Sequence, residues 1–203
     1  MPRDPLTNLL KGTDKRSIGR ANEVAALVLR EPRRFPQLIG QLWSDDGVVR
    51  MRAADATEKI SAKNPGLLKP FKAEFLGLLF EAEQKELRWH LAQMIPRLPL
   101  TKKERLRAAE GLRRYLKDTS SIVKTFALQG LTELARAEAS LLSEISENLE
   151  AAERAGTSAM KARARKLLKT LRSRRNAAPS LSEPPCGDCG LASLWAGAEP
   201  RFH

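Results

Sequence analysis

The chain has 203 residues, 42% of them hydrophobic, which is enough for the core of one domain or of a short repeat array. Its two cysteines both lie in the last eighteen residues, so the composition excludes a disulfide framework. No apolar run approaches the roughly 20 residues of a membrane span, and we expect a cytoplasmic protein. Lys and Arg outnumber Asp and Glu by 36 to 24, and the net charge of +12 favours nucleic acid or an acidic protein as partner.

The composition also predicts the fold class. Leu, Ala, Glu, Lys and Arg are abundant and are strong helix formers, whereas only 5% of the residues are aromatic. We therefore expect an all-α protein. Its first element in chain order is an N-terminal arm, residues 1–14. A helix is predicted over residues 17–30, with Asp14 as its N-cap and Pro32 as its stop, and this helix is expected to cap those that follow.

Four later helices share one apolar pattern. Their anchor residues Val49, Leu87, Val123 and Met160 are 38, 36 and 37 residues apart. Apolar or small residues recur 4, 7, 8 and 11 positions after each anchor, which is the buried face of a helix with a period of 3.6. These residues are Ala53, Ala56, Thr57 and Ile60; Leu91, Met94, Ile95 and Leu98; Ala127, Gly130, Leu131 and Leu134; and Ala164, Leu167, Leu168 and Leu171.

A second apolar helix is predicted just upstream of each anchored one. Its stripes are Phe35, Leu38, Ile39, Leu42 and Trp43; Leu68, Phe71, Phe75, Leu78 and Leu79; Leu106, Ala109, Leu112 and Leu116; and Leu142, Ile145, Leu149 and Ala152. Four helical hairpins result, a spacing that suits an α-solenoid. Pro96 and Pro99 are expected to shorten the anchored helix of the second hairpin.

The residue after each anchor is basic, and acidic residues precede the anchor in the turn, as at Asp45, Asp46 and Asp118. This pattern resembles the HEAT repeat over residues 33–173, and residues 158–165 resemble the closing repeat of small bacterial HEAT-repeat proteins of unassigned activity. The resemblance implies an α-solenoid of about four HEAT-like hairpins over residues 15–175, with an N-terminal capping helix. It implies a fold and no particular reaction.

Two sets of residues are candidates for the concave face of such a solenoid. The first is the ladder Arg50, Arg88, Lys124 and Lys161, which forms either a basic stripe for a ligand or structural bonds to the turns of neighbouring repeats. The second set, outside the core phase, includes Arg52, Trp89 and His90. A cation beside Trp89 is suited to stacking a base or binding a phosphate. HEAT-like DNA glycosylases of the alkylpurine type use aromatic residues and a carboxylate in such a cleft, and Asp55 and Glu58 are the nearby carboxylates here.

The closing helix, residues 157–175, is the candidate site for a polyanion because it contains no Asp or Glu. Its basic residues besides Lys161 are Arg163, Arg165, Lys166, Lys169, Arg172, Arg174 and Arg175. The alternative is that these charges only solvate the end of the array and balance the glutamates of the preceding helix.

Residues 176–203 are predicted to be a disordered tail that contains Pro and Gly. Cys186 and Cys189 within it have C-x-x-C spacing, but neither the four ligands of a structural zinc nor the βαβ setting of a redox dithiol accompanies them. His90 and His203 are too far apart in sequence to indicate a metal cluster. The sequence also contains no Gly-rich phosphate loop and no G-x-S-x-G elbow.

We therefore predict a non-catalytic scaffold or adaptor that binds a macromolecular partner on its curved surface, without metal or cofactor. A protein is the expected partner. The alternative is a nucleic-acid-binding protein, with a divergent DNA glycosylase of the alkylpurine type as its enzymatic form. The position of the positive charge distinguishes them, because a continuous concave stripe favours nucleic acid.

Overall fold

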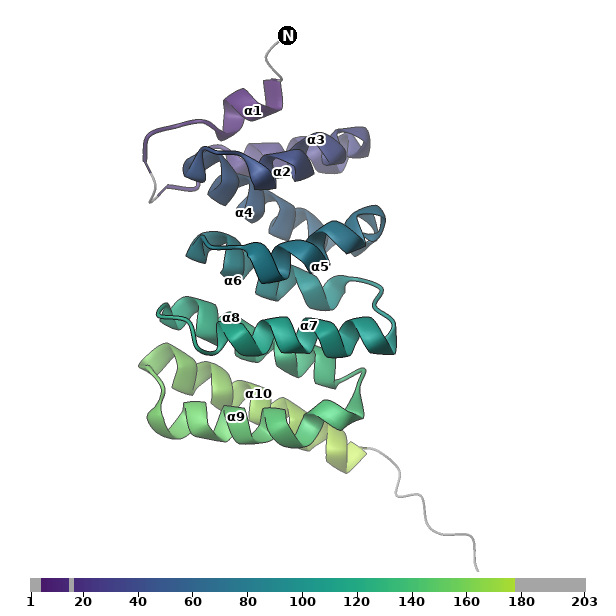
Figure 1. The fold of residues 1–203 in the computed structure, drawn as a ribbon, viewed down its shortest axis with the longest axis vertical. Coiled ribbons are helices and arrows are strands. Elements are labelled where there is room, and N and C mark those ends of the chain that lie inside the picture. The colour runs from purple at the N-terminus through teal and green to yellow at the C-terminus, as the bar shows by residue number, and fades with distance from the viewer. Residues whose placement is uncertain (1–4, 15–16, 178–203) are drawn as a thin grey trace, which may run out of the picture.

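The computed structural model describes residues 5–14 and 17–177, and within these ranges the chain forms helices and turns and no strand. The all-α prediction is therefore confirmed for this part of the chain (Figure 1). The α-helices are α1 (Pro5–Leu10), α2 (Ala21–Arg30), α3 (Phe35–Gly40), α4 (Gly47–Lys63), α5 (Lys72–Glu81), α6 (Lys85–Met94), α7 (Lys102–Tyr115), α8 (Ser121–Ala135), α9 (Leu142–Ala155) and α10 (Ser158–Ala177). Short 3₁₀ helices lie at Pro32–Arg34, Gln41–Trp43, Pro65–Phe71, Ile95–Arg97 and Ala139–Leu141.

The helices pack in the order in which they occur in the chain. Helices α4, α6, α8 and α10, which we call the anchor helices, contact one another in series, and α2 packs on the first of them. The partner helices α3, α5, α7 and α9 each contact the anchor helix that follows. Figure 1 shows the resulting pairs one above another along the long axis of the molecule.

The apolar stripes of the anchor helices form the core between successive pairs. Val49, Leu87 and Val123 are buried as predicted, and Met160 is half-buried. Each apolar stripe is buried as well, apart from the half-buried Leu171 at its end. The partner helices bury Leu38, Phe75, Leu112 and Leu149 against this core, among others.

Helices α6 and α8, which belong to successive pairs, come very close together at a glycine. A Cβ placed on Gly130 of α8 would overlap the carbonyl oxygen of Ala92 in α6. The helix–helix contact therefore requires a residue without a side chain at this position, and the small residue opposite it lets the two backbones approach.

Polar bonds connect consecutive partner helices. The buried Tyr115 hydroxyl of α7 donates to the carbonyl oxygen of Leu79 in α5 at 2.8 Å, and burial raises the pKa of this phenol above its ordinary value. Thr101 and Glu104 form a capping box at the start of α7, and Lys72 of α5 lies 2.7 Å from Glu104. The ammonium of Lys72 and the backbone N–H of Thr101 lower the pKa of Glu104 to about 2. The Tyr115–Leu79 and Lys72–Glu104 contacts both hold α7 on α5 and so join two successive helix pairs.

The sequence pattern fails at three residues of the partner stripes, since Leu106 of α7 is 39% exposed, Leu142 of α9 is 38% exposed and Trp43 is exposed as well. Trp43, predicted in the core, is 46% exposed because it lies in the 3₁₀ turn Gln41–Trp43, whose period of three residues shifts it out of the helical phase. Helix α6 is short as predicted, since the chain turns into a 3₁₀ helix at Ile95–Arg97, which contains Pro96.

The two ends also differ from the prediction. Part of the predicted arm forms α1, whose Leu6 and Leu10 are fully buried against α2 and α4. The capping helix starts at Ala21 with Arg20, rather than Asp14, at its N-cap position. At the other end α10 continues through Ala177, two residues into the predicted tail, and the rest of that tail, with Cys186 and Cys189, lies outside the described residues.

Replacing Leu131 with Asp is expected to destabilise the protein by several kcal/mol, because an unpaired carboxylate would enter the core between α6 and α8. The measurement is urea unfolding followed by circular dichroism. The matched control is Leu142→Asp, since this leucine of α9 is exposed and should tolerate the change. Equal stability of the two variants would contradict the assignment of the core.

Candidate binding surfaces

The first two residues of the predicted basic ladder bond neighbouring turns. The Arg50 guanidinium donates from Nε to Gln84 Oε1 at 2.9 Å and from Nη1 to the carbonyl oxygen of Ser44 at 2.6 Å. Gln84 in turn donates to the carbonyl oxygen of Gly47 at 3.0 Å. The turn before α4 is thereby tied to the turn before α6.

Arg88 repeats this arrangement one pair further on, where its Nε lies 3.0 Å from Oδ2 of the nearly buried Asp118. Lys124 and Lys161, in contrast, have no side-chain hydrogen bond or ion pair within residues 17–177. Arg50 and Arg88 therefore form structural bonds to the turns of neighbouring helix pairs. Their guanidinium groups are not available to bind a ligand, so the four ladder residues do not form a continuous basic stripe.

Arg52 is also committed to the fold, which corrects its expected place on an open concave face. Its side chain is buried and donates to the carbonyl oxygens of Leu10, Lys11, Asp14 and Ser17 at 2.6 to 3.2 Å. The N-terminal segment closes over the guanidinium so tightly that Gly19, at φ 52°, approaches it: a Cβ there would lie 2.6 Å from Arg52 Cζ.

An apolar groove of about 450 Å³ lies beside Arg52. Its apolar lining comes from α4, α6, α8 and the turn before α2, and consists of Ile18, Met51, Trp89, Ile122 and Phe126. Ile18 is 42% exposed and Ile122 is 47% exposed, so large apolar side chains face solvent here. Of these five residues only Trp89 was a predicted site residue. Met51 and Trp89 both stand two positions after an anchor, which is a sequence signal that identifies Met51 but not Ile18, Ile122 or Phe126.

His90 lines the groove from below its surface, so it is a groove residue but not an exposed one. The side chain is only 8% exposed, and its ring centroid lies 5.6 Å from that of Trp89. Burial lowers the pKa of His90 to about 4, against a smaller opposing effect of Asp55, while Lys59 lowers it further. The imidazole is therefore neutral at pH 7.

The groove has an acidic rim. Asp55 and Glu86 line it, and Asp55 is bound by Lys59 Nζ at 2.6 Å. Glu58 is turned away and bonds Arg97 at 2.7 Å. Trp89 and Asp55 thus share a groove, as the glycosylase resemblance implies, but the one arginine in the lining is occupied by backbone carbonyls. No described side chain of the groove offers a free cation to a DNA phosphate.

The basic residues of α10 occupy two settings. Arg163 is bound, with Nη1 donating to Gln129 Oε1 at 2.5 Å and its guanidinium 5.7 Å from the Phe126 ring centroid. Lys166, by contrast, is exposed. The side chains of Arg174 and Arg175 lie outside the described residues.

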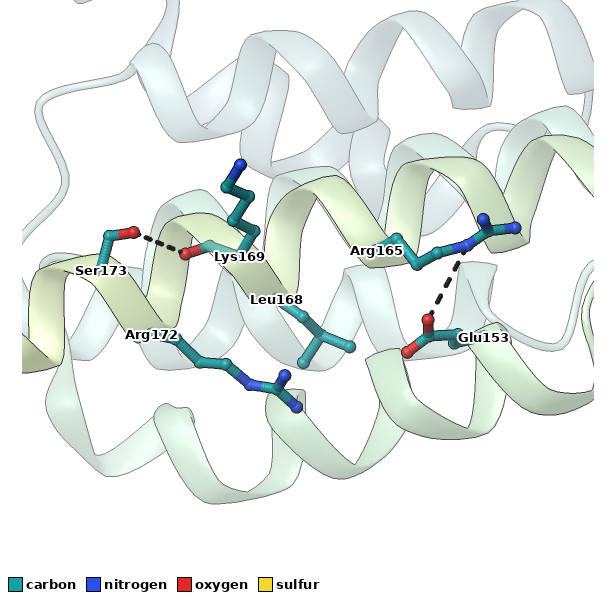
Figure 2. A pocket seen from close by; sticks show the side chains of 6 residues that line it. All are labelled: Glu153, Arg165, Leu168, Lys169, Arg172 and Ser173. Carbon is teal, nitrogen blue, oxygen red and sulfur yellow. Dashed lines mark hydrogen bonds and ion pairs between the residues drawn. The ribbon is translucent and has the colours of Figure 1, made fainter.

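Arg165, Lys169 and Arg172 line a shallow hollow of about 280 Å³ together with Glu153, Leu168 and Ser173 (Figure 2). Arg165 Nε lies 3.8 Å from Glu153 Oε1, and Ser173 bonds the backbone oxygen of Lys169 at 3.0 Å. The heads of Lys169 and Arg172 point away from each other in Figure 2. Only one of the three cations therefore has an acidic partner among the described side chains.

Across residues 5–14 and 17–177, no group of three or more His, Cys, Asp or Glu residues is placed to hold a metal ion. None of the helices in these ranges combines the length and apolar character needed to cross a membrane. A scan against protein-family models and searches of curated proteins and of solved structures found no match to this chain.

Replacing Arg52 with Met is expected to release the N-terminal segment, because four backbone carbonyls lose a charged donor. We expect a loss of about 2 kcal/mol in unfolding free energy and faster amide hydrogen exchange in α1. The control Arg33→Met should change neither, since that side chain is 85% exposed. Unchanged exchange in α1 would show that Arg52 does not hold this segment.

His90 makes stability dependent on pH. Its pKa is about 4 in the folded chain and lies near 6.5 when unfolded, so its contribution is complete above pH 6.5 and is lost as the pH falls toward 4. Between pH 7.5 and 4.5 the protein is expected to lose about 2 kcal/mol more stability than His90→Leu does. Parallel pH profiles for the two proteins, from urea unfolding, would contradict the assignment.

Proposed function

We propose that this chain is a non-catalytic scaffold, an α-solenoid of about four HEAT-like hairpins with an N-terminal cap, that binds a protein segment in the apolar groove. The repeat interpretation is supported by the spacing of the anchors, which is 36 to 38 residues, and by the serial packing of the anchor helices. The bonds of Arg50 and Arg88 to successive turns support it as well. Stacked pairs of this kind present an extended surface without reshaping the core.

The observation that carries the proposal is the exposure of Ile18 and Ile122 around a hollow that also contains Trp89 and Phe126. Large apolar side chains at a surface hollow mark sites of association, because covering them removes apolar area from water. Aromatic residues such as Trp89 contribute most of the binding energy in many protein interfaces.

The rim defines the chemistry of the partner segment. Asp55 and Glu86 are the acidic residues of the lining, with Lys59 at 2.6 Å from Asp55 and Lys85 at 3.8 Å from Glu86. A segment that places apolar side chains on Trp89 and Phe126, with a Lys or Arg beside them, satisfies both features.

The polar lining residues fit binding better than catalysis. Asp55 is held by Lys59, His90 is covered and neutral, and Arg52 is bound to backbone carbonyls. A general acid or base needs access to the group whose proton it transfers, whereas Asp55 and Arg52 are engaged by these contacts and His90 is covered.

Selection of peptides of about 12 residues from a display library against the whole protein tests the proposal. Selected peptides are expected to combine apolar and basic residues, and Ile122→Glu or Trp89→Ala should weaken their affinity by about tenfold or more. The control Leu142→Glu places a carboxylate on an exposed leucine outside the groove and should bind normally.

Hydrogen exchange on the bound complex supplies the second readout. Protection is expected in α4, α6 and α8, which line the groove. Peptides whose affinity is the same for the groove variants and the control, or whose protection lies elsewhere, would overturn the assignment of this surface.

A further inference from the structure

The last anchor helix, α10, differs from the other anchor helices on the face that they bury inside the stack. Five positions after the anchor, α4, α6 and α8 have Ala54, Ala92 and Leu128, all of which are buried. The corresponding residue of α10 is Arg165, and it is exposed. The helix face that is apolar and buried in α4, α6 and α8 therefore has a cation exposed to solvent in α10, at the end of the stack.

Four basic residues form one line on this helix. Lys161, Arg165, Lys169 and Arg172 follow one another at steps of four, four and three residues, so they leave the helix on one side, from which the heads of Lys169 and Arg172 diverge (Figure 2). At about 1.5 Å per residue the line is about 16 Å long. Lys166 lies next to it, and we call these five residues the basic row.

The charges of the basic row are largely unneutralised. Within residues 17–177 only Arg165 has an ion pair, at 3.8 Å from a Glu153 that is itself partly exposed, and such a pair contributes little. Like charges four residues apart destabilise a helix. An anion placed along this line would relieve that repulsion.

The opposite end of the stack provides an internal comparison. There Arg20 lies 2.7 Å from Glu23, and Arg33 and Arg34 lie 3.3 and 2.8 Å from Glu31. That end is charged and solvated with both signs present, which is sufficient for a soluble cap. The single sign of the basic row is therefore not required by solubility.

We propose that the basic row binds the phosphate backbone of double-stranded DNA without reading its sequence. The basic row has five cations, so it can neutralise at most about five phosphates of the duplex. The apolar face of α10, including Ala164, Leu167 and Leu168, is buried, so no apolar side chain of this face is available to enter a lipid bilayer. This surface is separate from the groove, and the proposal does not depend on the function proposed for it.

The test is fluorescence anisotropy with the whole protein and a labelled duplex of about 20 base pairs, between about 25 and 200 mM salt. Five phosphate contacts predict a slope of about −4.5 for the logarithm of the association constant against the logarithm of salt concentration. The triple variant Arg165→Glu, Lys169→Glu and Arg172→Glu should lose about 100-fold in affinity at the lowest salt.

A matched triple variant separates the row from the overall charge. Lys63→Glu, Lys69→Glu and Lys103→Glu change the net charge by the same amount at three exposed lysines outside α10. This control should lose no more than a few-fold in affinity. Thermal melts of both variants should stay close to that of the parent protein, because the six side chains are exposed.

Three results would overturn the proposal: no binding of duplex by the parent at low salt, equal losses in the two triple variants, or tighter binding to anionic lipid vesicles or polyglutamate than to DNA. The groove variant Ile122→Glu should bind duplex like the parent. Failure of DNA binding is therefore distinguishable from failure of the groove to bind peptides.

Discussion

The structure depends on the burial of one apolar stripe per anchor helix between two neighbouring helices. Helices α4, α6 and α8 are each covered on both sides along the stack, so their small residues are as necessary as their large ones. Ala92 and Gly130 show this most directly, since the backbones of α6 and α8 meet there. Close packing of this kind gives each pair a fixed position on the next and makes the surface rigid.

That constraint decides what happens to the cations near the interfaces. A guanidinium beside a buried helix end must have acceptors, because an unpaired buried charge is costly. Arg50 and Arg88 find them in the turns of the next pair, and Arg52 finds them in the carbonyls of the N-terminal segment. Residues whose type suggests ligand binding are thus used to hold the stack together.

The surfaces left over have opposite characters. The groove on α4, α6 and α8 is apolar with an acidic rim, and the exposed face of α10 is basic. The two proposals therefore assign partners of different chemistry to the two places. A scaffold with two such surfaces is suited to bringing a protein segment and a polyanion into one assembly, which connects the two proposals without making either depend on the other.

The sequence by itself determined the anchor helices, their partner helices and the buried stripes of the anchor helices. An apolar period of 3.6 is a local property, and the anchors Val49, Leu87 and Val123 are buried because every neighbour in the stack requires the same face. The basic character of α10 was equally visible, since charge needs no tertiary information.

Only the tertiary structure decided which polar side chains remain free. Arg52 and His90 lie outside the core phase of their helices, yet the N-terminal segment binds the first and packing around the groove covers the second. Both outcomes depend on residues far away in the chain, such as Leu10 and Ser17 for Arg52, whose position no local pattern encodes. The groove has the same origin, because Ile18, Trp89 and Ile122 come together only when α2, α4, α6 and α8 are stacked.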